Sequence, residues 1–268
     1  MLADVAENSD FARVVRAAHG DAWQALGGLF EGRGGATATH HGVRLMASGL
    51  PHPQWNSGDV SAADADIAAA QRFYGTLPWG VRVPAGMAWA HGRHLLRQRL
   101  MGLREPGFRP APVPRGLRVV AAGGADLDAV VAVDAAAFGT DGGASRPWFE
   151  ALLGAPPGIV TVARALAHGR AVAGGYAVAT DAAAGPSVFL AAIAVLPGYR
   201  RRGFGAAVSS WLLRRGFDAG AKLAHLAPDD ERAARLYSRL GFVETAGLDI
   251  YVDLASPQPG EIVAPAGD

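Results

Sequence analysis

Residues Phe189–Leu213 read FLAAIAVLPGYRRRGFGAAVSSWLL, a pattern that predicts a buried strand, a turn and a helix. Gly203 and Gly205 flank Phe204 where the helix begins. Because glycine has no Cβ, the main chain there can approach a ligand closely, and the free amides of the first helical turn point outward at the positive end of the helix dipole. Glycines also cap helices and allow tight packing, but the arrangement as a whole predicts an anion site suited to phosphate.

The turn differs from the two common nucleotide-binding loops. It lacks the Lys-Ser/Thr ending of the P-loop and the three-glycine spacing of a dinucleotide fold. It matches Arg/Gln-x-x-Gly-x-Gly/Ala, here Arg200–Gly205. The motif is preceded by Val195, at the end of the strand, and by a Pro-Gly turn. On these residues the sequence resembles the GNAT superfamily of acyl-CoA-dependent N-acyltransferases. In that family the turn binds the pyrophosphate of acyl-CoA through backbone amides, and the preceding strand hydrogen-bonds the pantetheine arm.

A second motif follows at the distance expected for that family. Family members often carry Asn-x-x-Ala-x-x-Leu-Tyr-x-x-x-Gly-Phe, and residues Asp230–Phe242 read DERAARLYSRLGF, with Asp230 in place of asparagine. The apolar residues fall on one face of a helix that Gly241 ends, so the spacing alone favours a core role for Tyr237. The resemblance implies instead that Tyr237 protonates the leaving CoA thiolate. Asp230 either contacts the cofactor, as the asparagine does, or simply caps the helix.

Together the two motifs imply an acetyl-CoA site. The resemblance leaves Arg201 and Arg202 either to contact the ribose 3′-phosphate or to form a solvated basic turn. The implied cofactor-binding residues are Ile193, Ala194, Val195, Arg200, Arg201, Arg202, Gly203, Phe204, Gly205, Ala206 and Asp230.

The composition favours a globular protein that acts on a small molecule. The 268 residues are 50% hydrophobic, and 25 basic against 24 acidic side chains leave a net charge of +1, so we expect neither nucleic acid nor a membrane as a partner. The absence of cysteine excludes disulfides, thiolate metal sites and a cysteine acyl-enzyme, and no metal site is expected. With no signal peptide and no apolar stretch of about 18 residues, we expect a cytoplasmic protein, a monomer or a homodimer.

The predicted fold is an α/β (α+β) protein with a GNAT-like mixed sheet flanked by helices. A proline-rich segment, Gly107–Gly116, suggests a boundary between an N-terminal domain at residues 1–110 and an acetyltransferase domain at residues 117–254, followed by a flexible tail at residues 255–268. In the second domain we expect strands at 117–122, 159–165, 171–180, 187–196, 222–227 and 242–254, and helices at 126–138, 146–153, 203–219 and 229–240.

The N-terminal half lacks the phosphate-binding turn. We expect helices at 10–29, 64–74 and 94–103, strands at 43–48 and 79–85, and a loop without regular structure at 49–61. Its end, GLREPGF, faintly echoes the SRLGF near the end of the second half, which suggests a degenerate GNAT-like copy in a tandem member of the superfamily. In that interpretation Trp55 and Asn56 line or cover the acceptor site. Alternatively, Trp55 only packs between the halves.

The resemblance implies an N-acetyltransferase that transfers an acetyl group from acetyl-CoA to a primary amine of an unidentified small-molecule acceptor. Without cysteine, direct attack in a ternary complex is the economical mechanism, with a backbone amide of Ile193–Val195 stabilising the oxyanion. The general base is not identified: Tyr176, Asp134, Glu150, His168 and water relays are all open. The main alternative is a non-catalytic acyl-CoA sensor or regulatory module. A nucleotide-binding protein is disfavoured, because no Walker lysine or metal-binding carboxylate accompanies the turn.

Overall fold

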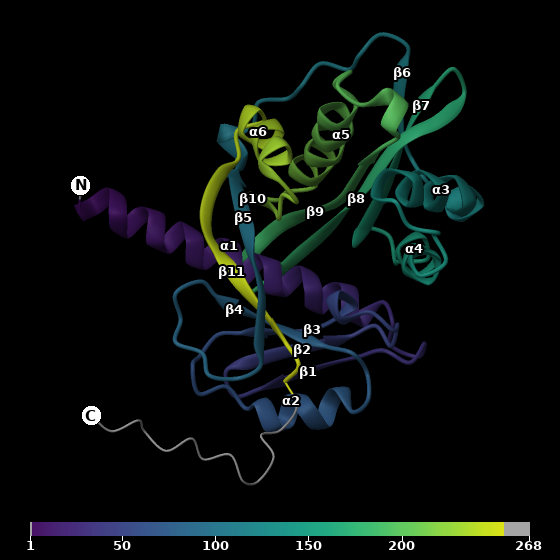
Figure 1. Ribbon diagram of the computed structural model, residues 1–268. Helices are drawn as coiled ribbons and strands as arrows, with labels where there is room; N and C mark the ends of the chain where they lie inside the picture. Colours follow the sequence, from purple (N-terminus) through teal and green to yellow (C-terminus); the bar gives the residue numbers. More distant parts are fainter. Residues whose placement is uncertain (1, 255–268) are drawn as a thin grey trace, which may run out of the picture.

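The computed structural model describes residues 2–254, so the tail predicted at 255–268 lies outside the described residues. A single 11-stranded sheet, in the order β1-β2-β3-β4-β11-β5-β10-β9-β8-β7-β6, runs through the molecule (Figure 1). The helices are α1 (Leu2–Gly28), α2 (Ile67–Tyr74), α3 (Leu127–Phe138), α4 (Ser145–Leu153), α5 (Phe204–Asp218) and α6 (Glu231–Arg239). The strands are β1 (Ala36–His40), β2 (Val43–Ala47), β3 (Asn56–Val60), β4 (Gly80–Pro84), β5 (Arg93–Arg104), β6 (Leu117–Ala121), β7 (Val160–Ala167), β8 (Arg170–Ala182), β9 (Gly185–Val195), β10 (Leu223–Leu226) and β11 (Val243–Val252).

Helices cover both faces of the C-terminal part of the sheet. Helices α5 and α6 lie on one side of β8 and β9, and α3 and α4 lie on the other (Figure 1). Val208 and Leu212 of α5 pack with Leu226 of β10 in one core cluster. Trp23 of α1 and Trp148 of α4 pack with buried residues of β8 and β9 in a second cluster. This architecture confirms the predicted mixed sheet flanked by helices.

The two halves of the chain repeat one topology. In the C-terminal half β9 and β10 are parallel neighbours joined through α5, and in the N-terminal half β3 and β4 are parallel neighbours joined through α2. In both halves the preceding strand pairs antiparallel with the first of the two, β8 with β9 and β2 with β3. The repeat is what a degenerate second copy of the C-terminal fold requires.

The last strand of each half pairs with a strand of the other half. Strand β11 pairs antiparallel with β4 of the N-terminal half, while β5 pairs antiparallel with β10 of the C-terminal half, and β5 and β11 pair with each other at the centre. Residues 1–110 and 117–254 therefore share one sheet across the proline-rich connection. The domain limits remain a prediction.

The helix predicted at residues 94–103 is wrong, because Arg93–Arg104 is strand β5. Leucine, arginine, glutamine and methionine are good helix formers, so local propensity favours a helix here. However, β5 hydrogen-bonds to β10 on one edge and to β11 on the other. Leu100, Met101 and Leu103 are buried, and this long-range pairing overrides the local preference.

The irregular loop predicted at residues 49–61 is also wrong in part. Asn56–Val60 is strand β3, buried along its length between β2 and β4. Gly58 lies within this strand without interrupting it. A Cβ there would lie 3.0 Å from Leu45 and 3.1 Å from Val43, so glycine permits the close packing of β3. Strand β1, Ala36–His40, has no counterpart among the predicted elements.

Candidate functional site

A groove opens where β9 and β10 diverge. These parallel strands pair only along Ser187–Phe189 of β9 and Leu223–His225 of β10. The rest of β9, Leu190–Val195, pairs with β8 on one edge and, among the described residues, has no partner strand on the other. The groove has a volume of about 600 Å³. It is lined by Ala137, Phe138, Ile193, Ala194, Val195, Tyr199, Arg200, Arg201, Gly203, Phe204, Gly205, Ala206, Asp229, Asp230, Arg232, Ala233, Leu236 and Arg239.

The N-terminus of α5 opens into this groove without a capping side chain. The N-cap residue is Gly203, with a φ of 79°, a left-handed conformation that favours glycine. The first helical hydrogen bond runs from the amide of Ala207 to the carbonyl of Gly203, so the preceding amides of the first turn are left for a ligand. A Cβ on Gly205 would lie 3.5 Å from Leu236 and 3.6 Å from Val195, both groove-lining residues. The backbone therefore comes close to any molecule in the groove.

The arginines of the turn have different positions. Arg200 donates from Nε to the Val195 carbonyl at 3.1 Å and from Nη2 to the Ala137 carbonyl at 2.7 Å, which ties the end of α3 to the end of β9. Arg201 lines the groove, whereas Arg202 does not and lies over the Tyr199 ring, with Cζ 5.4 Å from the ring centroid. Arg201 is thus placed to meet an anion, and Arg200 holds the wall of the groove.

Helix α6 presents one face to the groove and another to the core. Asp230 caps the helix, because its carboxylate accepts a hydrogen bond from the Ala233 amide at 2.7 Å. Tyr237 is not among the groove-lining residues: it is 8% exposed and packs edge-on against Phe242. Burial raises the pKa of the Tyr237 phenol, and the Asp229 carboxylate raises it further. The phenol therefore stays protonated at neutral pH.

A β-bulge interrupts β9 beside the groove. Gly174 pairs with Ala194 and Tyr176 pairs with Ala191, so two residues of β9 lie opposite the single residue Gly175. Ala192, in the bulge, has a φ of 50°, which is unusual for a residue with a side chain. Bulges redirect backbone groups and are frequent next to active sites. The bulge residue Ile193 lines the groove, and the bulge precedes Val195, the end of β9 that Arg200 ties to α3.

Trp55 and Asn56 lie outside the groove. The Trp55 ring stacks on Trp148 of α4, with centroids 5.3 Å apart and an interplanar angle of 14°. Asn56 is fully buried, and its side-chain oxygen accepts hydrogen bonds from the Ser48 and Gly49 amides. Its side-chain nitrogen donates to the carbonyls of Leu50, His52 and Pro78. With these bonds Asn56 holds the loop before β3, and its amide has no free group to offer an acceptor.

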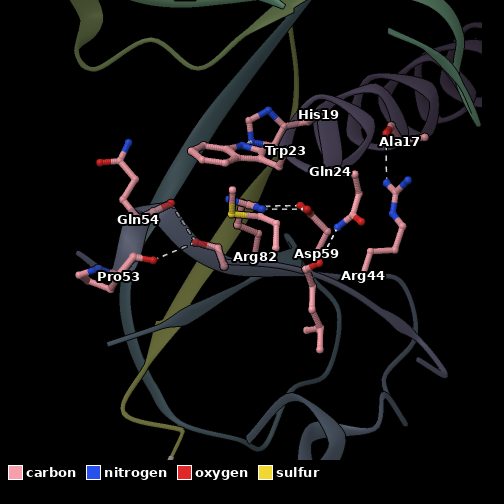
Figure 2. Close-up of polar contacts among 12 residues, drawn as sticks. Ala17, His19, Trp23, Gln24, Arg44, Pro53, Gln54, Asp59 and Arg82 are labelled. Carbon is pink, nitrogen blue, oxygen red and sulfur yellow. Dashed lines mark hydrogen bonds and ion pairs between the residues drawn. The ribbon is translucent and has the colours of Figure 1, made fainter. Parts of the chain in front are cut away.

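The equivalent position in the N-terminal half is closed to an anion. Asp66 caps α2 by accepting a hydrogen bond from the Ala69 amide at 2.8 Å, so a carboxylate occupies this helix N-terminus. Where β3 and β4 pair, Arg82 and Asp59 form a buried bidentate ion pair at 2.8 Å, and Trp23 covers the guanidinium (Figure 2). The start of α2 thus carries a carboxylate, where the start of α5 leaves its first amides free.

The candidate bases occupy very different surroundings. Glu150 is exposed and lies 4.0 Å from Arg146, and His168 is in the exposed turn between β7 and β8. Tyr176 is buried, which raises its pKa above that of an ordinary tyrosine. Asp134 is half-buried, and burial raises the pKa of its carboxyl to about 6, partly offset by hydrogen bonding from Ser145.

Sequence reasoning missed several residues of the groove. Arg232, Leu236 and Arg239 recur at helical spacing on the groove face of α6, a signal that the second motif already contained. Ala137 and Phe138 carried no such signal, because α3 is brought to the groove only by tertiary packing. Within residues 2–254, no cluster of three or more metal-binding side chains is present, and no helix there is long and apolar enough to span a membrane.

Comparison with known proteins identifies the C-terminal part. Residues 132–242 match the model of the acetyltransferase (GNAT) family. No curated protein matches the chain. The fold is similar to that of a GCN5-related N-acetyltransferase from Kribbella flavida, at 19% identity and a TM-score of 0.64, covering 87% of this chain and 93% of the other.

Two further solved structures share the fold. A GCN5-related N-acetyltransferase from Sphaerobacter thermophilus has 15% identity and a TM-score of 0.52, covering 78% of this chain and 79% of the other. A tandem GNAT protein from the clavulanic acid biosynthesis pathway has 14% identity and a TM-score of 0.53, covering 81% and 79%. Residues 132–242 of this chain thus match the GNAT family of acetyltransferases, and the GNAT fold extends over most of the chain.

Proposed function

We propose that the protein transfers an acetyl group from acetyl-CoA to a primary amine of a small molecule, by direct attack in a ternary complex. The observation that carries this proposal is the uncapped N-terminus of α5, which opens into the groove beside the unpaired edge of β9. A helix N-terminus suits a pyrophosphate, and a free strand edge suits the amides of a pantetheine arm. Family membership of residues 132–242 points to the same donor.

The cofactor fits the groove in one direction. The amides from Gly203 to Ala206 bind the pyrophosphate, and Ile193–Val195 hydrogen-bonds the pantetheine arm. Arg201, together with Arg232 and Arg239 of α6, supplies positive charge for the phosphates. The thioester then lies at the bulge of β9, away from the phosphate end. A backbone amide of the bulge stabilises the oxyanion, and the protonated phenol of Tyr237 gives its proton to the leaving thiolate.

The cofactor site is tested by Gly205→Val. Gly205 is a better site for this substitution than Gly203. The φ of 79° at Gly203 would strain any other residue, whereas a Cβ at Gly205 would make only ordinary van der Waals contacts. A valine there fills the groove between β9 and α6, so we expect at least a tenfold loss of acetyl-CoA affinity by calorimetry with an unchanged melting temperature. Gly198→Val is the matched control, since Gly198 is exposed in the same turn and lies outside the groove lining. Equal affinity in the two variants would exclude this groove as the cofactor site.

A non-catalytic acyl-CoA sensor is the second candidate. The packing of Tyr237 into the core, outside the groove lining, favours it. The two functions differ in a thiol-release assay with acetyl-CoA and a panel of amino acids, polyamines and aminoglycosides. Release of CoA that depends on an added amine supports the enzyme, and binding of acetyl-CoA without release supports the sensor.

The N-terminal half serves the acceptor and does not bind CoA in this proposal. Asp66 and the buried Asp59–Arg82 pair occupy the places where its own cofactor site would be. Trp55 connects this half to the acetyltransferase domain by stacking on Trp148. The half-exposed Trp55 ring provides an apolar wall for an acceptor, and Asn56 contributes by fixing the loop.

A further inference from the structure

Asp134 belongs to the face of α3 that borders the groove. Ala137 and Phe138, which line the groove, follow Asp134 by three and four residues. Residues at this spacing lie on the same side of an α-helix, one turn or about 5.4 Å apart along its axis. Asp134 therefore lies one turn before Ala137 and Phe138 on the same face of α3, next to the residues that line the groove.

The direction of that turn leads away from the phosphate end. Arg200 ties the C-terminal end of α3, at the Ala137 carbonyl, to the Val195 carbonyl at the end of β9. Asp134 precedes Ala137 and so lies further from this tie. Its negative charge is one cause of the raised pKa of Tyr176, after burial. Tyr176 pairs with Ala191 at the edge of the β9 bulge. Asp134 thus sits at the end of the groove that the thioester occupies in the proposed function.

The Asp134 carboxylate accepts a hydrogen bond from Ser145 at the start of α4, but this neighbour brings no positive charge. It forms no ion pair among the described residues, although α3 and α4 carry other paired charges. Arg146 of α4 pairs with Asp128 and Glu150, β9 has no titratable side chain, and Tyr176 of β8 is a neutral phenol. A half-buried carboxylate without a cation is costly to the fold, since burial penalises its charged form.

We infer that Asp134 is the general base that removes a proton from the acceptor amine in the acetyl transfer proposed above. The carboxylate accepts a proton from the amine nitrogen as that nitrogen forms a bond to the thioester carbon. The bond between carbon and sulfur then breaks, and the sulfur leaves with its electron pair and takes up a proton from Tyr237. The products are the acetamide and CoA. The protonated Asp134 then loses its proton to water and the Tyr237 phenolate takes one up from water, so both side chains return to their starting states. A base with a pKa near 6 is ionised at neutral pH and still strong enough to assist this transfer.

The inference rests on the proposed function and is tested with Asp134→Asn, Asp134→Glu and the control Asp128→Asn in the full chain. Asp128 is an exposed carboxylate on the same helix, paired with Arg146. The rate of CoA release is measured with the panel amine that the wild type uses best and, without amine, as hydrolysis of acetyl-CoA. We expect Asp134→Asn to lower kcat about 10²-fold or more, with acetyl-CoA affinity unchanged, and Asp134→Glu to recover part of the rate.

Stability and pH dependence separate a base from a structural residue. Removing an unpaired, half-buried charge should leave the melting temperature of Asp134→Asn equal to or above that of the wild type. The wild-type rate should rise with pH through an apparent pKa of about 6, and this rise should disappear in Asp134→Asn. Wild-type rates in Asp134→Asn, or an equal loss in Asp128→Asn, would overturn the assignment of Asp134 alone. A wild-type protein that releases CoA to neither amines nor water would instead overturn the proposed function, and the base with it.

Discussion

Tyr237 is the residue at which sequence pattern and family resemblance point to different roles. The helical spacing of DERAARLYSRLGF favours a core residue, and the structure places Tyr237 in the core with 8% of its surface exposed. The resemblance implies a general acid. Leu236 and Ala233 form this part of the groove wall. The two roles are compatible only if the Tyr237 hydroxyl reaches the thioester sulfur from the core side of that wall.

Tyr237→Phe distinguishes the two roles. If the hydroxyl protonates the thiolate, the variant should lose about 10²-fold or more in kcat while acetyl-CoA affinity changes little, because the proton is needed only as charge develops on sulfur. Steady-state kinetics and calorimetry on the same preparation measure both quantities. Leu236→Met, a volume-conserving change on the groove face, serves as a control for altered packing. Full activity with a lower melting temperature would leave Tyr237 as a core residue.

At the scale of elements, the two halves use equivalent helices differently. Helix α5 begins at Gly203 without a side-chain cap, whereas α2 begins at Asp66, whose carboxylate satisfies the Ala69 amide. A carboxylate at a helix N-terminus takes the place that an anionic ligand would need. The first amides of α5 are therefore free for a ligand, whereas a carboxylate of the chain itself occupies the start of α2.

The loop before β3 is the element by which the N-terminal half reaches the acetyltransferase domain. Trp55→Ala removes its stacking on Trp148 without touching the groove, so we expect a higher KM for the acceptor, by about fivefold to tenfold, and an unchanged constant for acetyl-CoA. Steady-state kinetics with each substrate varied in turn provide the test. Trp79→Ala is the control, since Trp79 stacks on Tyr74 within the N-terminal half. A change confined to the KM for acetyl-CoA would contradict the proposal that the N-terminal half serves the acceptor.

On the scale of the whole molecule, buried polar groups lie where the halves meet. His19 of α1 accepts a hydrogen bond from the Trp23 indole at 3.0 Å, and its ring lies 5.8 Å from that of His225 on β10. Both histidines are fully or nearly fully buried. Burial lowers the pKa of each well below 6.5, and the positive charge of Arg82 lowers that of His19 further. Both imidazoles are therefore neutral in the folded protein at neutral pH.

This pair should make the protein sensitive to acid. Because the folded-state pKa lies below the unfolded value of about 6.5, the unfolded chain binds protons first as the pH falls. Stability is then unaffected above pH 6.5 and declines below it, by about 1.4 kcal/mol per pH unit for each histidine until its folded pKa is reached. In urea unfolding between pH 7 and 5, His225→Leu should show a shallower decline than the wild type. An identical pH dependence would show that His225 does not contribute to it.

The sequence by itself determined the strand, turn and helix that line one wall of the groove. The strand, the Arg-x-x-Gly-x-Gly turn and the helix after it are contiguous. The proposed anion site consists of backbone amides at a helix N-terminus, which is a property of a few consecutive residues. Ten of the eleven predicted cofactor residues line the groove, with Arg202 outside it. The helices and strands of the C-terminal half could be predicted for the same reason, since their hydrophobic periodicity is local.

Only the tertiary structure decided the rest. Residues 94–103 prefer a helix locally and become β5 because β10 and β11, more than a hundred residues away, pair with both edges. Asn56 looked like a ligand-binding amide on a loop, yet the neighbouring carbonyls and amides bury and satisfy it. Asp134 could be named as a base from sequence but not chosen over Tyr176, Glu150 or His168. Burial and charge pairing distinguish them, and both depend on contacts between segments far apart in the chain.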